Sequence, residues 1–137
     1  MTLLEKLIFI GGVFHLGTLL ASAQVPRELR FSKELAKVSP LLRQWILVAG
    51  GYIVYNLTAF GVISLAFAPA LASGAPLARA LCAYIALFWL ARLLIQLFVF
   101  DAKPFLRTRF LRWGYHGLTL VFVYHSLVYG FAALHAT

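Results

Sequence analysis

Four long apolar runs alternate with short polar segments along the chain. They cover about residues 3–23, 45–67, 81–100 and 113–134. At about 1.5 Å of helical rise per residue, each run can cross the hydrocarbon layer of a bilayer, which is about 30 Å thick. An isolated span in lipid satisfies its backbone groups only as an α-helix, and the alternation typical of a membrane β-barrel is absent. The pattern therefore predicts one all-α integral membrane domain, residues 1–137, with four transmembrane helices in an antiparallel bundle.

The residues between the runs mark several helix ends. Ser39 followed by Pro40 is typical of an N-cap with proline in the first turn, so the second helix is expected to begin there. This helix is expected to end before Pro69, in a segment with two prolines and a glycine (APALASGAPLA). The third helix is expected to end at Asp101–Pro104.

The segment RFSKELAKV, residues 30–38, has a helical pattern of its own. Phe31, Leu35 and Val38 recur at helical spacing, and the charged residues point elsewhere. Ser32 has the side chain of an N-cap residue. We therefore expect a short helix lying in the membrane interface, and the alternative is an ordinary polar loop.

Composition agrees with a membrane location. Of the 137 residues, 63% are hydrophobic and 12% are charged, and the mean hydropathy is +0.91. Soluble domains are about 45–50% apolar and about 25% charged. The net charge of +8 would suggest nucleic-acid binding in a soluble protein. Here the basic residues fall between the apolar runs, with no recognised binding motif, so nucleic acid is not an expected partner.

The distribution of basic residues predicts an orientation. The first loop carries five and the third loop carries four, whereas the middle loop has Arg79 alone. The basic residues of the first and third loops are Arg27, Arg30, Lys33, Lys37, Arg43, Lys103, Arg107, Arg109 and Arg112. By the positive-inside rule, loops 24–43 and 101–112 are cytoplasmic and both termini are outside, in an inner or plasma membrane.

The N-terminal run also has features of a secretory signal peptide. Lys6 precedes an apolar stretch, and small residues at 21–23 resemble a cleavage site. Arg27 and Arg30 follow at once, which disfavours translocation of that side. We therefore expect the first run to be a transmembrane helix.

Small and polar residues mark the faces on which membrane helices meet. In the first helix they form one stripe, and in the third helix one side carries Arg92 and Gln96 near mid-span. In the second helix, small and polar residues including Asn56 are spread more widely, so contact on more than one side is expected. The stripe of the first helix is Gly11, Gly12, His15, Thr18 and Ser22, and the side of the third is Cys82, Ile85, Trp89, Arg92, Gln96 and Val99.

An arginine at mid-span is costly unless it has a partner, since insertion into the membrane centre costs about 2.5–3.5 kcal/mol. Arg92 lies about 12 Å of helical rise from the end of its run at Phe100, too far for easy snorkelling. Two interpretations stay open: Arg92 braces the neighbouring helices, or it contacts a ligand.

Two histidines lie near the middle of their spans. His15, beside Gly11 and Gly12, and His125 are candidate axial ligands of a haem, or one of them of a chlorophyll magnesium, because glycines leave room for a flat macrocycle. The alternative is hydrogen bonding to a neighbouring helix. The single cysteine, Cys82, is expected to pack in the core, and no metal site is expected.

A basic cluster at the inner membrane surface is the other candidate site. Its members could bind a lipid phosphate, with His116 or Asp101 handling a proton, or could simply be the positive-inside signal. The phosphate candidates are Lys103, Arg107, Arg109, Arg112 and His116. No catalytic motif or acidic pair accompanies them, so no catalytic residue is assigned.

Three function classes follow from these observations. An accessory or structural subunit of a larger membrane complex is favoured, because glycine-rich faces, 15% aromatic residues and few acids suit a packing role. A haem- or chlorophyll-binding electron-transfer subunit is the first alternative, and a lipid-binding or lipid-modifying enzyme is the second. The expected partners are membrane lipids and other membrane-protein subunits or further copies of the chain.

Overall fold

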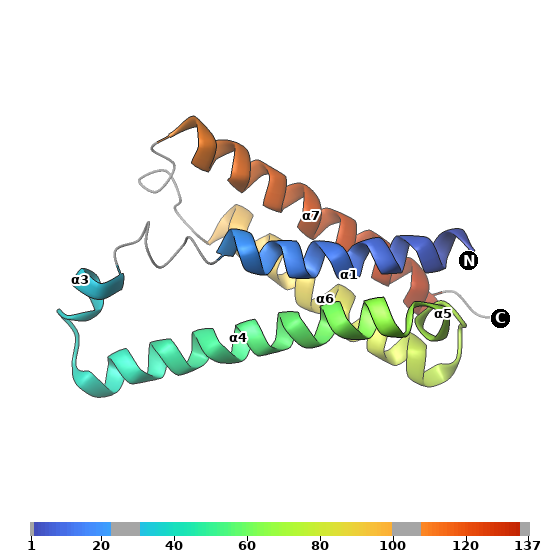
Figure 1. Ribbon diagram of the computed structural model, residues 1–137, viewed down its shortest axis with the longest axis horizontal. Coiled ribbons are helices and arrows are strands. Elements are labelled where there is room, and N and C mark those ends of the chain that lie inside the picture. The colour runs from blue at the N-terminus through green and yellow to red at the C-terminus, as the bar shows by residue number, and fades with distance from the viewer. Residues whose placement is uncertain (1, 23–30, 100–107, 135–137) are drawn as a thin grey trace.

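The computed structural model describes residues 2–22, 31–99 and 108–134, and most of them are helical (Figure 1). Six helices and no strand occur within these residues. The helices are α1 (Leu3–Ser22), α3 (Phe31–Leu35), α4 (Pro40–Ala66), α5 (Ala68–Leu71), α6 (Pro76–Phe98) and α7 (Arg109–Leu134).

The predicted fold class is confirmed. Helices α1, α4, α6 and α7 are long and apolar enough to cross a membrane. They alternate in direction, so α1 begins and α7 ends at the same end of an antiparallel bundle (Figure 1). The assignment of that end to the outside of the cell stays a prediction from the charge count.

Three of the four long helices begin before the apolar runs that predicted them. Ser39 caps α4 as predicted, because its side chain accepts a hydrogen bond from the Leu42 N–H at 3.2 Å and Pro40 occupies the first turn. Helix α4 ends at Ala66, before Pro69. Helices α4, α6 and α7 all begin about one turn before the corresponding apolar run, so Arg79 lies inside α6 rather than in a loop.

The short helix expected near residues 30–38 is present as α3. It begins at Phe31, so Ser32 lies inside the helix rather than capping it. The Arg43 Nε–H donates to the Leu35 carbonyl at 3.2 Å, which joins the end of α3 to the first turn of α4.

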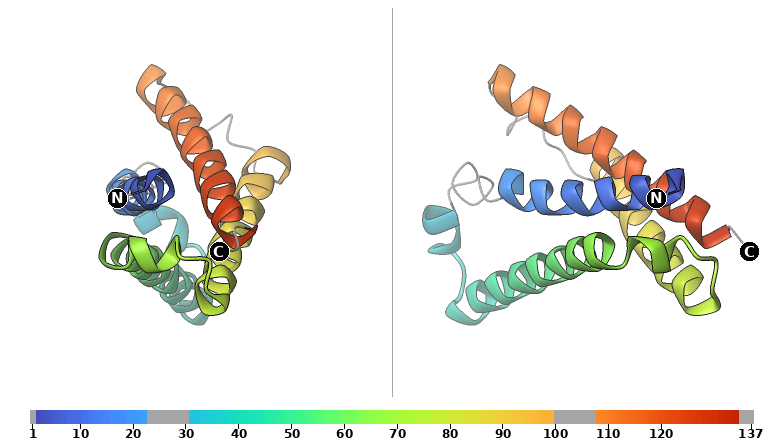
Figure 2. Two further views of the ribbon diagram at one scale, coloured as in Figure 1. Left: turned by 90° about the vertical axis from the view of Figure 1, so that its right-hand side faces the viewer. Right: turned by 45° about the vertical axis from the view of Figure 1, so that its right-hand side comes forward.

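The four long helices pack as two pairs, α1 with α4 and α6 with α7, and α1 also packs on α7 (Figure 2). Glycines bring α1 and α4 together: a Cβ on Gly12 would lie 2.9 Å from the Gly61 carbonyl oxygen. Between α6 and α7, the Arg79 Nε–H donates to the Ala133 carbonyl at 2.9 Å. Close backbone approach and interhelical hydrogen bonds are the forces that hold helices together in lipid.

The predicted contact faces of α1 and α6 are largely correct. The buried residues of α1 include Gly11, Gly12, His15 and Thr18, and those of α6 are Cys82, Ile85, Trp89 and Gln96. Val99 is 70% exposed, because it lies just past the last turn of α6.

Helix α4 differs from expectation. Its buried residues are Leu57, Phe60, Gly61 and Ser64, all in its second half. The first half, Leu41–Tyr55, has no buried residue, and it runs past the end of α1 toward α3 (Figure 1). A Cβ on Gly50 or Gly51 would meet no atom of the described residues within 4 Å. The sequence pattern predicts that α4 is contacted on more than one side, but its first half is largely exposed.

The approach of α1 to α4 predicts the effect of one added methyl group. In Gly12→Ala, the new Cβ would meet backbone of α4 at 2.9 Å, so the helices must separate, with an expected loss of about 1–3 kcal/mol in unfolding free energy. Gly17→Ala is the matched control, because its Cβ meets nothing within 4 Å and alanine favours the helix. The unfolding free energy of each variant is measured by titration with a denaturing detergent, with circular dichroism as the readout. Equal stability of the two variants would contradict the packing.

Candidate functional site

A cluster of polar and aromatic side chains lies where the four long helices meet. We define the central polar cluster as His15 of α1, Ser64 of α4, Trp89 of α6, and His125 and Tyr129 of α7. Each of the five is at most 1% exposed. In a membrane such residues are expensive to bury, so their partners decide what the cluster does.

His15 is hydrogen-bonded at both ring nitrogens. The Trp89 indole N–H donates to His15 Nε2 at 2.7 Å. An indole nitrogen only donates, so Nε2 is the acceptor and the ring proton is on Nδ1. The Nδ1–H then donates to the Gly11 carbonyl, one turn back on α1, at 2.7 Å. His15 thus binds α1 to α6 with no ring nitrogen left over.

Tyr129 connects α7 to α4. Its hydroxyl and that of Ser64 are hydrogen-bonded at 2.6 Å. Gly11 provides the space for this tyrosine, because a Cβ at that position would lie 2.8 Å from the Tyr129 hydroxyl oxygen. The space that Gly11 leaves on α1 is therefore filled by the Tyr129 side chain of α7.

His125 lies inside an aromatic stack. Its ring centroid is 4.0 Å from that of His15 and 4.8 Å from that of Trp89, with an interplanar angle of 27° to the indole. Both ring nitrogens are buried and have no hydrogen-bond partner among the described residues. Stacking, rather than hydrogen bonding, is what places this histidine.

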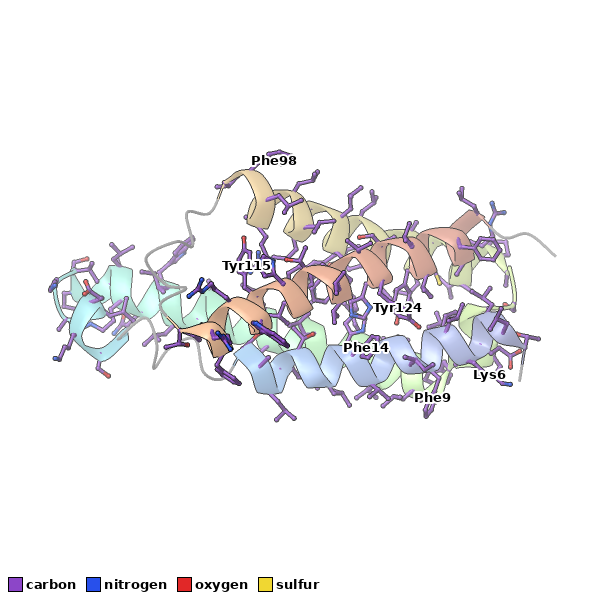
Figure 3. The ribbon with its side chains drawn as sticks, turned by 90° about the horizontal axis from the view of Figure 1, so that it is seen from above. Lys6, Phe9, Phe14, Phe98, Tyr115 and Tyr124 are labelled. Atoms are coloured by element: carbon purple, nitrogen blue, oxygen red, sulfur yellow. The ribbon has the colours of Figure 1, made fainter. Side chains whose placement is uncertain are left out.

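Helix α1 contacts α7 at a second level. The Tyr124 hydroxyl donates to the Leu7 carbonyl at 2.7 Å. Its ring meets Phe14 edge to face, with centroids 5.1 Å apart, and the two side chains face each other between the helices (Figure 3). This contact adds to the attachment of α1 made by His15.

Arg92 lies half-buried between α6 and α7. Its guanidinium carbon is 5.3 Å from the centroid of the Phe122 ring, and Phe122 stacks on Trp89 at 4.9 Å. A cation over an aromatic ring of the next helix is a bracing contact. The alternative, contact with a ligand, stays a prediction.

Gln96 belongs to a second polar network between α6 and α7. Its side-chain amide donates to the Thr119 hydroxyl. The Tyr115 hydroxyl donates to the main-chain carbonyl of Gln96 at 3.0 Å. The Thr119 hydroxyl in turn donates to the Tyr115 carbonyl at 3.0 Å. Asn56, the third intramembrane polar candidate, is half-buried on α4, about two turns before Ser64. It is not part of either network.

His15 and His125 are not arranged in this structure as two axial ligands on either side of one haem. Two axial imidazoles direct one nitrogen each at a metal between them, but both nitrogens of His15 are already hydrogen-bonded. The rings are 4.0 Å apart, which leaves no room for a macrocycle between them. The space beside Gly11 and Gly12 is taken by Tyr129 and by α4.

The basic cluster is described in part. Arg109, Arg112 and His116 are exposed on α7 and, with Trp113, line a hollow of about 270 Å³. Lys103 and Arg107 lie outside the described residues. His116 and His125 face opposite sides of α7, as their spacing predicts, since one is exposed and the other buried.

Sequence reasoning missed part of the central polar cluster. Tyr129 was not singled out, although it follows His125 at a spacing of four residues, which places both on one face of a helix. Its bond to Ser64 joins positions 65 residues apart, and no local pattern signals that pairing.

No protein-family model matches the chain, and neither does any curated protein or solved structure. The case for a function therefore rests on the geometry of the bundle.

The bond between Trp89 and His15 predicts a large effect from a small change. Trp89→Phe leaves the buried His15 Nε2 without its donor, so we expect a loss of about 1–3 kcal/mol in unfolding free energy. Trp113→Phe makes the same substitution at a residue that is 74% exposed, and a change within about 0.5 kcal/mol is expected. Unfolding by denaturing detergent measures both. Indistinguishable losses would show that the indole N–H contributes nothing.

Proposed function

We propose that the protein is a non-catalytic accessory subunit of a larger membrane complex, and that the first half of α4 is its docking surface. The observation that carries the proposal is the exposed face of α4 just beyond its contact with α1. There, Gly51 and two tyrosines lie beside one another, and no other helix of the described residues packs against them. We call this surface, formed by Val48, Gly51, Tyr52 and Tyr55, the α4 docking face.

The α4 docking face has the composition of a helix–helix contact. Tyr52 is 71% and Tyr55 is 73% exposed, and the four residues line a hollow of about 360 Å³. A Cβ on Gly51 would touch nothing within 4 Å. Small residues that admit a neighbouring backbone, next to polar side chains, are typical of interfaces between transmembrane helices.

The α4 docking face lies beyond the contact of α4 with α1. Gly12 of α1 meets Gly61 and Ser64 of α4. Tyr52 and Tyr55 lie about 18 and 14 Å of helical rise before Ser64, and Ser22 lies about 15 Å after Gly12, so both tyrosines are level with the end of α1 in this antiparallel pair. A partner helix packed there would offer carbonyl, hydroxyl or amide groups to the two exposed hydroxyls.

The interior of the bundle supports a structural role. His15, Ser64, Tyr129 and Gln96 are each hydrogen-bonded to another helix, so these polar groups hold the protein together. A rigid bundle with one long helix free along half its length is suited to positioning a partner. The electron-transfer alternative receives no such support, given how the two histidines lie.

Filling the hollow predicts the loss of the partner. Gly51→Leu would fill the α4 docking face without disturbing the bundle, because no atom lies within 4 Å of the new Cβ. Gly17→Leu is the control, since Gly17 is exposed on α1 and equally open. In a mild-detergent purification from native membranes, we expect the wild type and Gly17→Leu to retain a second membrane protein in a fixed ratio, and Gly51→Leu to lose it.

Three outcomes would contradict the proposal. The wild type could be recovered alone, or it could be recovered as a homo-oligomer with no second protein, which would mean self-association instead. Loss of the partner in Gly17→Leu as well would show that the attachment does not depend on α4. Native mass spectrometry of the purified material distinguishes these cases.

A further inference from the structure

The first turns of α7 carry a basic face that the bundle does not use. Arg109, Arg112, Trp113 and His116 follow one another at helical positions i, i+3, i+4 and i+7, so they lie on one side of the helix. All four are exposed. Together they line a hollow of about 270 Å³. Their side chains thus converge on one small concave surface.

This basic face points away from the other described helices of the bundle. The buried residues of α7 are Phe122, His125, Tyr129 and Ala132. At 3.6 residues per turn, they lie on the side of α7 opposite to Arg112 and His116. The hollow therefore opens to the surroundings of the bundle, which in a membrane protein are lipid and the aqueous interface.

The depth of the basic face matches the headgroup layer. About 27 Å of helical rise separates His116 from Leu134, and about 37 Å separates Arg109 from Leu134. The hydrocarbon layer is about 30 Å thick, and headgroups extend the bilayer to about 40–45 Å. If the end of α7 lies at one boundary of the hydrocarbon, His116 lies near the other boundary and both arginines lie among headgroups.

The charges of this face suit a phosphate. Two guanidinium groups offer paired N–H donors that match phosphate oxygens, and the imidazole adds a third nitrogen. Helix α7 contains no aspartate or glutamate that could neutralise them. Trp113, on the same face and 74% exposed, has the amphipathic ring that favours the boundary between headgroups and acyl chains.

We propose that Arg109, Arg112 and His116 form a binding site for the phosphate of an anionic phospholipid headgroup. Trp113 would lie against the part of the lipid's acyl chains nearest the headgroup. A lipid is favoured over a soluble phosphate because the hollow faces away from the bundle, at headgroup depth, beside an exposed tryptophan. The site is independent of the α4 docking face, so the two proposals can fail separately.

Native mass spectrometry of the full chain in non-ionic detergent tests the site. Phosphatidylglycerol and phosphatidylcholine with the same acyl chains are titrated, and bound lipid is counted. We expect tighter binding of phosphatidylglycerol to the wild type. The R109Q/R112Q variant should weaken it about 25-fold, at about fivefold per arginine. The control is K33Q/K37Q, which removes the same charge from exposed positions around α3 and should leave the affinity within about twofold.

The charge-preserving variant R109K/R112K distinguishes a loss of lipid binding from a loss of folding. It should unfold like the wild type and lose no more than about fivefold in affinity, because lysine keeps the charge but not the paired donors. Equal weakening in R109Q/R112Q and K33Q/K37Q would overturn the site in favour of general charge attraction. Competition by soluble glycerol phosphate at the same concentration as the lipid would also overturn it, because the site would then recognise a free phosphate.

Discussion

The hydrogen bond from the Trp89 indole to His15 is the interaction on which the bundle depends. An apolar side chain is as stable against lipid tails as against another helix. Burial of apolar area therefore does not by itself bring helices together in a membrane. A polar bond between helices does, because neither partner finds water in the hydrocarbon. This bond, 2.7 Å long and fully buried, joins α1 to α6, which are far apart in the sequence and do not form one of the two main helix pairs.

The other central contacts are arranged around this bond. His125 stacks on both rings that form it, and so brings α7 against α1 and α6 at the same depth. Tyr129 then reaches Ser64 of α4 across Gly11. The result is that all four long helices meet at one level. The second half of α4 is packed in the bundle at that level, whereas its first half is largely exposed. The exposed glycine and tyrosines of this first half are therefore the candidate contact with another protein.

Short-range patterns predicted much of this fold. The apolar runs gave four spans, Ser39 and Pro40 marked the start of α4, and the small residues of α1 identified its buried face. The pairing of helices could not be predicted, because His15 and Trp89 are 74 positions apart. From the sequence, the glycines beside His15 indicate room for a macrocycle, whereas in the structure the Tyr129 side chain lies against Gly11. Equally, the spacing of glycines in α4 could not tell which half would be covered, since that depends on the lengths and crossing of the neighbouring helices.

The tautomer of His15 tests this account most directly. Because the Trp89 nitrogen can only donate, His15 must carry its proton on Nδ1 and accept at Nε2. Nuclear magnetic resonance of the full chain in micelles, with ¹⁵N-labelled histidine and tryptophan, reports both features. We expect the Nδ1-protonated tautomer and a scalar coupling across the hydrogen bond between Trp89 Nε1 and His15 Nε2. A His15 protonated at Nε2, with no coupling to Trp89, would contradict the account.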